Sequence, residues 1–270
     1  MGIRAVVVAV TVLLSSSATA DRLLPIAPVT QATPVWCWLA VGEMVFRHYG
    51  VPAVNDSFQC GVIGAISVGT ATEACAKDCA RCAIAGGDAT TVLSMLTEYP
   101  RRAALLKKVE SPRVFVSHAN PLTVDELRRE LDGDRPVVVG INPDGRSEAF
   151  GASAHVALVV GYENSGRDGL RLIVNDPFPF SAKTWPDPYL KAGATLVAPG
   201  RYLVDVALLA GQLGWAESFL VRADGWHHVV TRYCLASTPL APSTCPAGPL
   251  DAPKTPCRCG IASGVVVDGD

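Results

Sequence analysis

The sequence predicts an α+β domain, in which a helical lobe packs against a twisted antiparallel β-sheet. Helical patterns predominate up to about residue 131, apart from a loop region rich in Gly, Ala and Cys over 55–90 with short helical pieces, and strong β-branched runs begin at residue 136. Helices that come first and strands that come later are typical of this class rather than of alternating βαβ units. Apolar residues make up 49% of the chain and charged residues 18%, which indicates a globular protein and excludes a disordered one.

Three helices are expected in the first half of the chain. The first covers 36–49, has an apolar face and is stopped by Gly50. The second covers 89–99 and ends at Pro100. The third covers 123–131 and opens with a capping box, in which a threonine and a glutamate three residues later satisfy the first backbone N–H groups.

Runs rich in β-branched residues predict the strands of the sheet. Three runs are strong, and a polar loop that contains glycine joins the second to the third as a hairpin. Four further runs are weaker. The strong runs cover 136–142, 155–162 and 170–175, and the weaker ones cover 114–116, 200–209, 217–222 and 225–233.

The first twenty residues have the pattern of a secretory signal peptide. Arg4 precedes an apolar run over 5–14, and small residues before the boundary predict cleavage after Ala20. The apolar run is too short for a membrane span, which needs roughly 20 residues. We therefore expect an exported protein, secreted or periplasmic, without a membrane span. Its expected organisation is a signal peptide over 1–20, one folded domain over 21–232, and an irregular tail rich in Cys, Pro and Gly over 233–270.

Nine cysteines, an odd number, point to one unpaired thiol in the exported chain. An oxidising compartment favours disulfides, and eight cysteines form two groups of four that could each close two bonds of unknown connectivity. The groups are Cys60, Cys75, Cys79 and Cys82, and Cys234, Cys245, Cys257 and Cys259. Cys37 is left over, and such a thiol is either incidental or reactive.

The spacing of Cys75, Cys79 and Cys82 also matches a pattern that can hold an iron–sulfur cluster. Export to an oxidising compartment argues against a cluster, and a zinc site would lack a nearby histidine. Disulfides are therefore favoured, and we expect neither a metal nor a cofactor.

Cys37 lies in the first turn of the helix expected over 36–49. A cysteine attacks as its thiolate, whose pKa is lowered by an imidazolium and by the positive end of a helix. His48 lies eleven residues further along the same helix, about 16 Å away, and cannot reach the thiol. His118 lies in a turn-like stretch without an evident partner. His155 opens a strand behind a loop of small residues, so it is the preferred base; the remaining candidates are His227 and His228.

A catalytic base needs an acceptor for its second ring nitrogen, and acyl transfer needs donors for the oxyanion. The strand after that of His155 ends at Asn175 and Asp176, and a hairpin would return this end to the histidine. Asp176 is preferred as the acceptor, with Asn175 in reserve. The side-chain amide of Gln31, six residues before Cys37, could act with the Cys37 backbone N–H as the oxyanion donors.

These motifs together resemble the papain-like cysteine peptidases, in particular the bacterial branch of bacteriocin-leader-processing and effector-type peptidases. The similar features are Gln31 followed after five residues by Cys37-Trp38, a histidine that begins a strand ending in Gly-Tyr, and a following Asp-Pro at Asp176. The resemblance implies that Gln31, Cys37, His155 and Asp176 are oxyanion donor, nucleophile, base and orienting residue. It covers roughly 28–180 and more faintly extends to 222, while the cysteine-rich insert over 60–82 and the tail have no match, and no inhibitory propeptide is expected.

Each of these residues also has a simpler interpretation. A lone cysteine is more often a core thiol, a lone strand histidine is usually structural, and Asp-Pro often starts a turn. The set as a whole favours catalysis. The alternatives are an acyltransferase or isopeptidase with the same nucleophile, and an inactive, disulfide-rich binding protein. Trp185 and Trp215 are expected in the core, although one of them could cover the active site.

The expected partner is a protein or peptide substrate. The formal net charge is −2 and the chain contains no basic run, which argues against nucleic acid and anionic membrane surfaces as partners. We expect the protein to act as a monomer.

Overall fold

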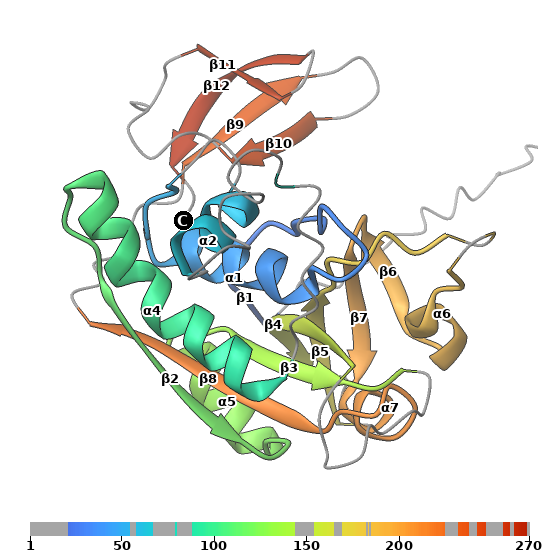
Figure 1. The fold of residues 1–270 in the computed structure, drawn as a ribbon. Helices are drawn as coiled ribbons and strands as arrows, with labels where there is room; N and C mark the ends of the chain where they lie inside the picture. The colour runs from blue at the N-terminus through green and yellow to red at the C-terminus, as the bar shows by residue number, and fades with distance from the viewer. Residues whose placement is uncertain are drawn as a thin grey trace, which may run out of the picture.

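The computed structural model describes residues 21–54, 58–66, 79, 88–143, 154–164, 169–181, 183 and 185–224, together with the backbone of four strands between 232 and 268. Between residues 21 and 224, an antiparallel sheet of eight strands forms the centre of the domain (Figure 1). Its strands follow the order β2-β8-β3-β4-β5-β7-β6, and β1 pairs with β4 beside this path. The bounds are β1 Arg22–Leu23, β2 Arg113–Ala119, β3 Val137–Ile141, β4 His155–Asn164, β5 Leu170–Asn175, β6 Thr195–Ala198, β7 Arg201–Asp205 and β8 Glu217–Asp224.

Helices cover both sides of this sheet. The described helices are α1 Cys37–His48, α2 Phe58–Ile66, α4 Ala89–Lys107, α5 Val124–Asp132, α6 Pro188–Ala192 and α7 Val206–Gly211. Figure 1 shows α1, α2 and α4 together on one side, with α1 against β4 and α4 against β2, and α5 on the other side. The helices and the antiparallel sheet confirm the predicted α+β class.

The core lies between α1 and the sheet, because α1 is apolar on almost every side. Ten of its twelve residues are buried, from Cys37 to Phe46. The strands β3 and β4 present fully buried valines to both neighbouring layers, as expected for the central strands of a covered sheet. The start of α1 is thereby held firmly against the end of β4 where His155 begins the strand.

The helix predicted over 89–99 is longer than expected, since α4 continues through Pro100 to Lys107. The predicted end at Pro100 was wrong, although proline does remove one backbone hydrogen bond. Tyr99 and Ala103 are fully buried on either side of it. Helices in proteins derive most of their stability from the packing of such a face, and here the packing outweighs the lost bond.

Other differences concern short elements. The candidate strand over 114–116 is part of the longer β2, and the candidate over 200–209 divides into β7 and α7 at Val206. The sequence analysis did not find α6 or β6, which are only five and four residues long. Elements of this length carry too few residues for a periodic pattern.

The tail was expected to be irregular, and this was wrong for its backbone. Four strands form a separate antiparallel sheet in the order β10-β9-β12-β11. Their bounds are β9 Arg232–Ser237, β10 Pro242–Pro246, β11 Pro256–Cys259 and β12 Ala262–Asp268. Cys234 and Cys245 are directly paired across β9 and β10. The disulfides predicted for the second cysteine group involve side chains outside the described part of the chain. Most of the strand predicted over 225–233 also lies outside the described residues.

The register of β1 depends on a glycine in β4. Leu23 pairs with Gly161, and a Cβ atom added at Gly161 would lie 2.3 Å from the backbone oxygen of Arg22. Because backbone atoms cannot move aside as a side chain can, we predict that Gly161→Ala lowers the free energy of unfolding by about 1–3 kcal/mol. Chemical denaturation measures this change.

Gly64, an exposed residue of α2, is the matched control for that substitution. Nothing lies within 4 Å of a Cβ atom added there. Alanine is the better helix former, so Gly64→Ala is expected to raise stability by about 0.5–1 kcal/mol. Equal effects of the two substitutions would contradict the predicted close approach of β1 and β4.

Candidate active site

Cys37 is the first residue of α1 and so lies in the first helical turn, as predicted; it is buried with 7% of its surface exposed. A turn precedes the helix, in which the Trp36 N–H donates to the Thr33 carbonyl at 3.2 Å. The first helical turn contains no acidic residue, and Trp36 provides no side-chain cap. The positive end of the helix dipole therefore acts on the Cys37 thiol without a neighbouring carboxylate in that turn.

His155 and Asp176 meet at the ends of the adjacent strands β4 and β5. Nε2 of His155 lies 2.9 Å from each of the two carboxylate oxygens of Asp176, and the Asp176 side chain is fully buried. The carboxylate also accepts the backbone N–H of Phe178 at 2.8 Å, which fixes its rotation. Because Nε2 bonds to Asp176, Nδ1 is the ring nitrogen left to bond the sulfur of Cys37.

Cys37 and His155 shift one another's pKa in opposite directions. Burial raises the pKa of the Cys37 thiol, but the positive charge and hydrogen bond of His155 and the backbone N–H of Val156 outweigh it, so the pKa falls below its ordinary value. Burial lowers the pKa of His155, while the Asp176 carboxylate and the Cys37 thiolate raise it well above its ordinary value. These opposite shifts favour a thiolate–imidazolium pair.

Asn175, the reserve for Asp176, lies in a different place. Its Nδ2 donates to the Ile26 carbonyl at 2.9 Å, and its Oδ1 accepts from Nε of Arg201 at 2.8 Å. It therefore ties the N-terminal segment and β7 to β5. The geometry brings Asp176, and not Asn175, to His155.

Gln31 lies beside the turn that leads into α1, and its side chain is oriented by that turn. Its Nε2 donates to the Thr33 carbonyl at 2.8 Å, and its backbone N–H donates to the Pro177 carbonyl at 2.9 Å. Its Oε1 is buried without a hydrogen-bond partner among the described residues. One N–H of Nε2 thus remains for another acceptor.

The other histidines have different surroundings. His48 lies at the far end of α1 with its Nε2 2.9 Å from the Asp134 carbonyl oxygen. His118 was expected in a turn without a partner, but it lies in β2 with Nε2 2.7 Å from a carboxylate oxygen of Glu217. The antiparallel pairing of β2 with β8 provides this partner, which the local sequence could not reveal. His227 and His228 lie outside the described residues.

Cys60 and Cys79 of the first cysteine group form a disulfide, while Cys75 and Cys82 lie outside the described part. Of the cysteines whose side chains are described, Cys37 is free. The described residues contain no group of three His, Cys, Asp or Glu side chains that could hold a metal ion. None of the helices described above has both the length and the apolar character of a membrane span.

Comparison with known protein families gives a match over most of the domain. The profile of the Peptidase_C39 like family matches residues 23–194, which is more than half of the 270 residues. The chain belongs to the Peptidase_C39 like family. No curated protein matches the sequence at a significant level. Membership supports a cysteine peptidase of the papain-like kind, and the matched range includes Gln31, Cys37, His155 and Asp176.

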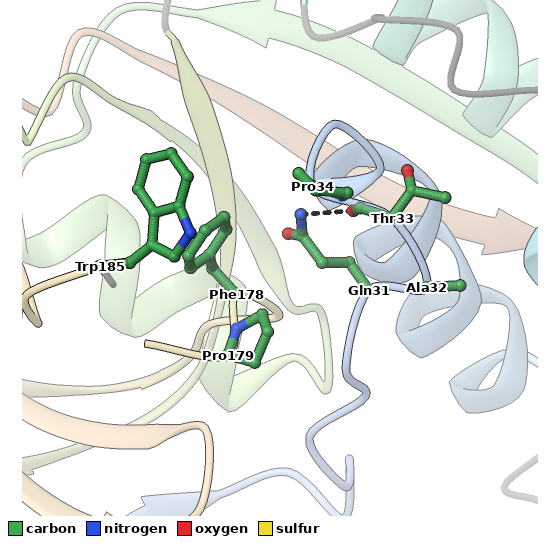
Figure 2. A pocket seen from close by; sticks show the side chains of 7 residues that line it. All are labelled: Gln31, Ala32, Thr33, Pro34, Phe178, Pro179 and Trp185. Carbon is green, nitrogen blue, oxygen red and sulfur yellow. Dashed lines mark hydrogen bonds between the residues drawn. The ribbon is translucent and has the colours of Figure 1, made fainter. Parts of the chain in front are cut away.

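A pocket of about 170 Å³ opens next to this site (Figure 2). Its walls are Gln31, Ala32, Thr33 and Pro34 on one side and Phe178, Pro179 and Trp185 on the other. Figure 2 shows Nε2 of Gln31 directed to Thr33 and Oε1 directed towards the aromatic side.

The aromatic wall of the pocket extends from the histidine. Phe178 meets the His155 ring edge to face, with centroids 6.2 Å apart, and Trp185 meets Phe178 at 5.6 Å. Trp185 was expected in the core, but it is 55% exposed, whereas Trp215 is buried as expected. The sequence analysis missed Phe178, whose only signal is its position two residues after Asp176.

The thiolate–imidazolium pair can be tested by the pH dependence of alkylation. Since the pKa of Cys37 is lowered by His155, the wild-type protein should react with iodoacetamide at a pH well below the ordinary thiol pKa of about 8.5. His155→Ala removes the charge and the hydrogen bond that oppose most of the effect of burial and leaves only the Val156 N–H against it, so the profile of this variant should move to higher pH.

The histidine of the same helix supplies the control for this alkylation experiment. His48→Ala changes α1 at its other end and should leave the profile of Cys37 unchanged. Identical profiles for wild type and His155→Ala would show that His155 does not govern the thiol.

Proposed function

We propose that this protein is an exported cysteine peptidase that hydrolyses peptide bonds through a thioester acyl-enzyme. The observation that carries the proposal is the contact of Cys37, His155 and Asp176 in a member of the Peptidase_C39 like family. A thiolate next to an imidazolium is an activated nucleophile paired with a general acid, and a carboxylate that holds the ring completes the arrangement.

In the acylation step, the Cys37 thiolate attacks the carbonyl carbon of the scissile bond and forms a C–S bond. The carbonyl π electrons move to the oxygen, which becomes an oxyanion. The His155 imidazolium then donates its proton to the leaving nitrogen as the C–N bond breaks, and the amine leaves. Asp176 keeps the ring in place through Nε2 while Nδ1 transfers the proton.

In the deacylation step, the neutral imidazole of His155 removes a proton from water as the water attacks the thioester. The tetrahedral intermediate expels the Cys37 thiolate and releases the carboxylic acid product. The imidazolium remains paired with the thiolate, so the site returns to its starting charge state. No redox partner is required for either step.

Gln31 is assigned the oxyanion in both steps. The Thr33 carbonyl takes one N–H of its Nε2, so the other can donate to the oxyanion together with the Cys37 backbone N–H. An oriented donor costs no reorganisation when the negative charge appears. The amide orientation set by Thr33 supports this role.

Two observations support export. The first twenty residues have the pattern of a signal peptide. Cys60 and Cys79 form a disulfide, and disulfides persist in oxidising compartments.

Turnover of a peptide library tests the proposed chemistry. Cys37→Ser should abolish cleavage, and Gln31→Ala should lower kcat by about 10²-fold with little change in KM, because the oxyanion exists only along the reaction path. The initial rates give both constants. Rapid alkylation of Cys37 without cleavage of any peptide would contradict a peptidase and favour the transferase, whereas alkylation no faster than that of a free surface cysteine would favour an inactive binding protein.

The pocket beside Gln31 suggests which substrates are preferred. Its aromatic wall begins at Phe178, which touches the ring that protonates the leaving amine. A cavity of about 150 Å³ holds a benzene ring, and this one measures about 170 Å³. We infer that it receives an aromatic or large aliphatic side chain from the leaving-group side of the scissile bond.

Trp185→Ala removes the exposed wall of this pocket. We expect kcat/KM to fall by about 10-fold for peptides with an aromatic residue on the leaving-group side and to stay unchanged for those with alanine there. Phe115→Ala is the control, because Phe115 is a comparably exposed aromatic residue on β2, and it should affect neither peptide. Equal losses for both peptides would contradict a side-chain pocket.

A further inference from the structure

Gln59, near the start of α2, bonds to the backbone on both sides of Gln31. Its Oε1 accepts the Ala32 N–H at 2.9 Å, and its Nε2 donates to the Thr30 carbonyl at 3.1 Å. Only 5% of Gln59 is exposed, so these bonds form in a dry environment. One side-chain amide thus holds the peptide units that flank the proposed oxyanion donor.

Glu43 of α1 fixes which way this amide points. Its Oε2 accepts from Nε2 of Gln59 at 3.1 Å, while its Oε1 accepts from Nε and Nη2 of Arg47 at 2.9 and 2.7 Å. A carboxylate and a carbonyl only accept hydrogen bonds, and a backbone N–H only donates. Only one orientation of the Gln59 amide therefore satisfies Glu43, Thr30 and Ala32 at once.

The segment that carries Gln31 is neither helix nor strand, so it depends on such bonds for its position. On the opposite side, the Gln31 N–H donates to the carbonyl of Pro177, the residue after Asp176. The segment is thus held between α2 and the end of β5. Cys60, next to Gln59, is joined to Cys79 by the disulfide, which restrains the start of α2.

We propose that Gln59 is a positioning residue for the oxyanion donor Gln31, an inference that rests on the proposed peptidase function. Gln59 fixes the backbone on both sides of Gln31, and the Thr33 carbonyl fixes its side chain. An oxyanion donor stabilises the transition state only when it is held in place in advance, so the effect of Gln59 lies in kcat.

The first experiment compares Gln59→Leu with Gln59→Ala and Val62→Ala. Leucine keeps most of the volume of glutamine but makes none of the three hydrogen bonds. We expect both Gln59 variants to lower kcat by about 10- to 100-fold with KM nearly unchanged, as displaced catalytic groups do. Val62, fully buried in the same helix, is the control, and Val62→Ala should lower stability while keeping kcat.

A double substitution shows whether Gln59 acts through Gln31. Gln31→Ala with Gln59→Leu should have the same kcat as Gln31→Ala alone, because a missing donor cannot be displaced further. If the double variant instead loses kcat by the product of the two single-variant losses, the inference is overturned. The alkylation profile of Cys37 should be unchanged in Gln59→Leu, and a shifted profile would overturn it as well, since the effect would then lie in the thiolate pair.

Amide hydrogen exchange provides a readout that needs no substrate. Gln59→Leu should lose protection at Ala32, whose N–H donates to Gln59, and Val62→Ala should not. Unchanged protection at Ala32 would overturn the inference, whether or not the wild-type protein cleaves peptides. Absence of peptide cleavage by the wild-type protein would contradict only the proposed function. If Gln59→Leu fails to fold, Gln59→Asn takes its place. Asparagine keeps the polarity but is one methylene too short to reach both Thr30 and Ala32. This variant should lose kcat and protection at Ala32, each to a smaller extent.

Discussion

The burial of Cys37 is the constraint on which the site depends, because burial raises the pKa of its thiol. The charge and hydrogen bond of His155 lower that pKa, and the Asp176 carboxylate in turn raises the pKa of His155. These pKa shifts depend on close contact of the three side chains. This requires the first residue of α1, the first of β4 and the residue after β5 to meet, and the packing of α1 against the sheet brings them together.

Much of this meeting could be predicted because its signals are local. A helix start shows at Cys37, a strand start shows at His155, and the β4–β5 hairpin returns Asp176 to the histidine. The choice between Asn175 and Asp176 could not be made from the sequence. Strand alternation settles it in the structure, since neighbouring residues project to opposite faces and Asn175 is bonded to Ile26 and Arg201 instead.

Contacts between distant loops and side-chain amides could not be predicted, because they follow no period along the chain. The bonds of Gln59 to Thr30 and Ala32 join residues 27 to 29 positions apart. His118 likewise found its partner Glu217 through strand pairing across 99 positions. Pro100 is a strong local signal that wrongly predicted a helix end, because tertiary packing on the buried face of α4 outweighs it.

The site is thus supported in two separate ways. The contact of Cys37, His155 and Asp176 depends on α1, β4 and β5, whereas the segment of Gln31 depends on the α2 residue Gln59 and on the Pro177 carbonyl. Two residues link these supports directly: Pro177 follows Asp176 in the chain, and Glu43 of α1 accepts a hydrogen bond from Gln59. The cysteine-rich insert over 60–82, which had no match in the resemblance, begins directly after Gln59 and contributes the rest of α2 and the Cys60–Cys79 disulfide to the second support. The disulfide therefore restrains the start of the same helix whose residue Gln59 holds the backbone on both sides of Gln31.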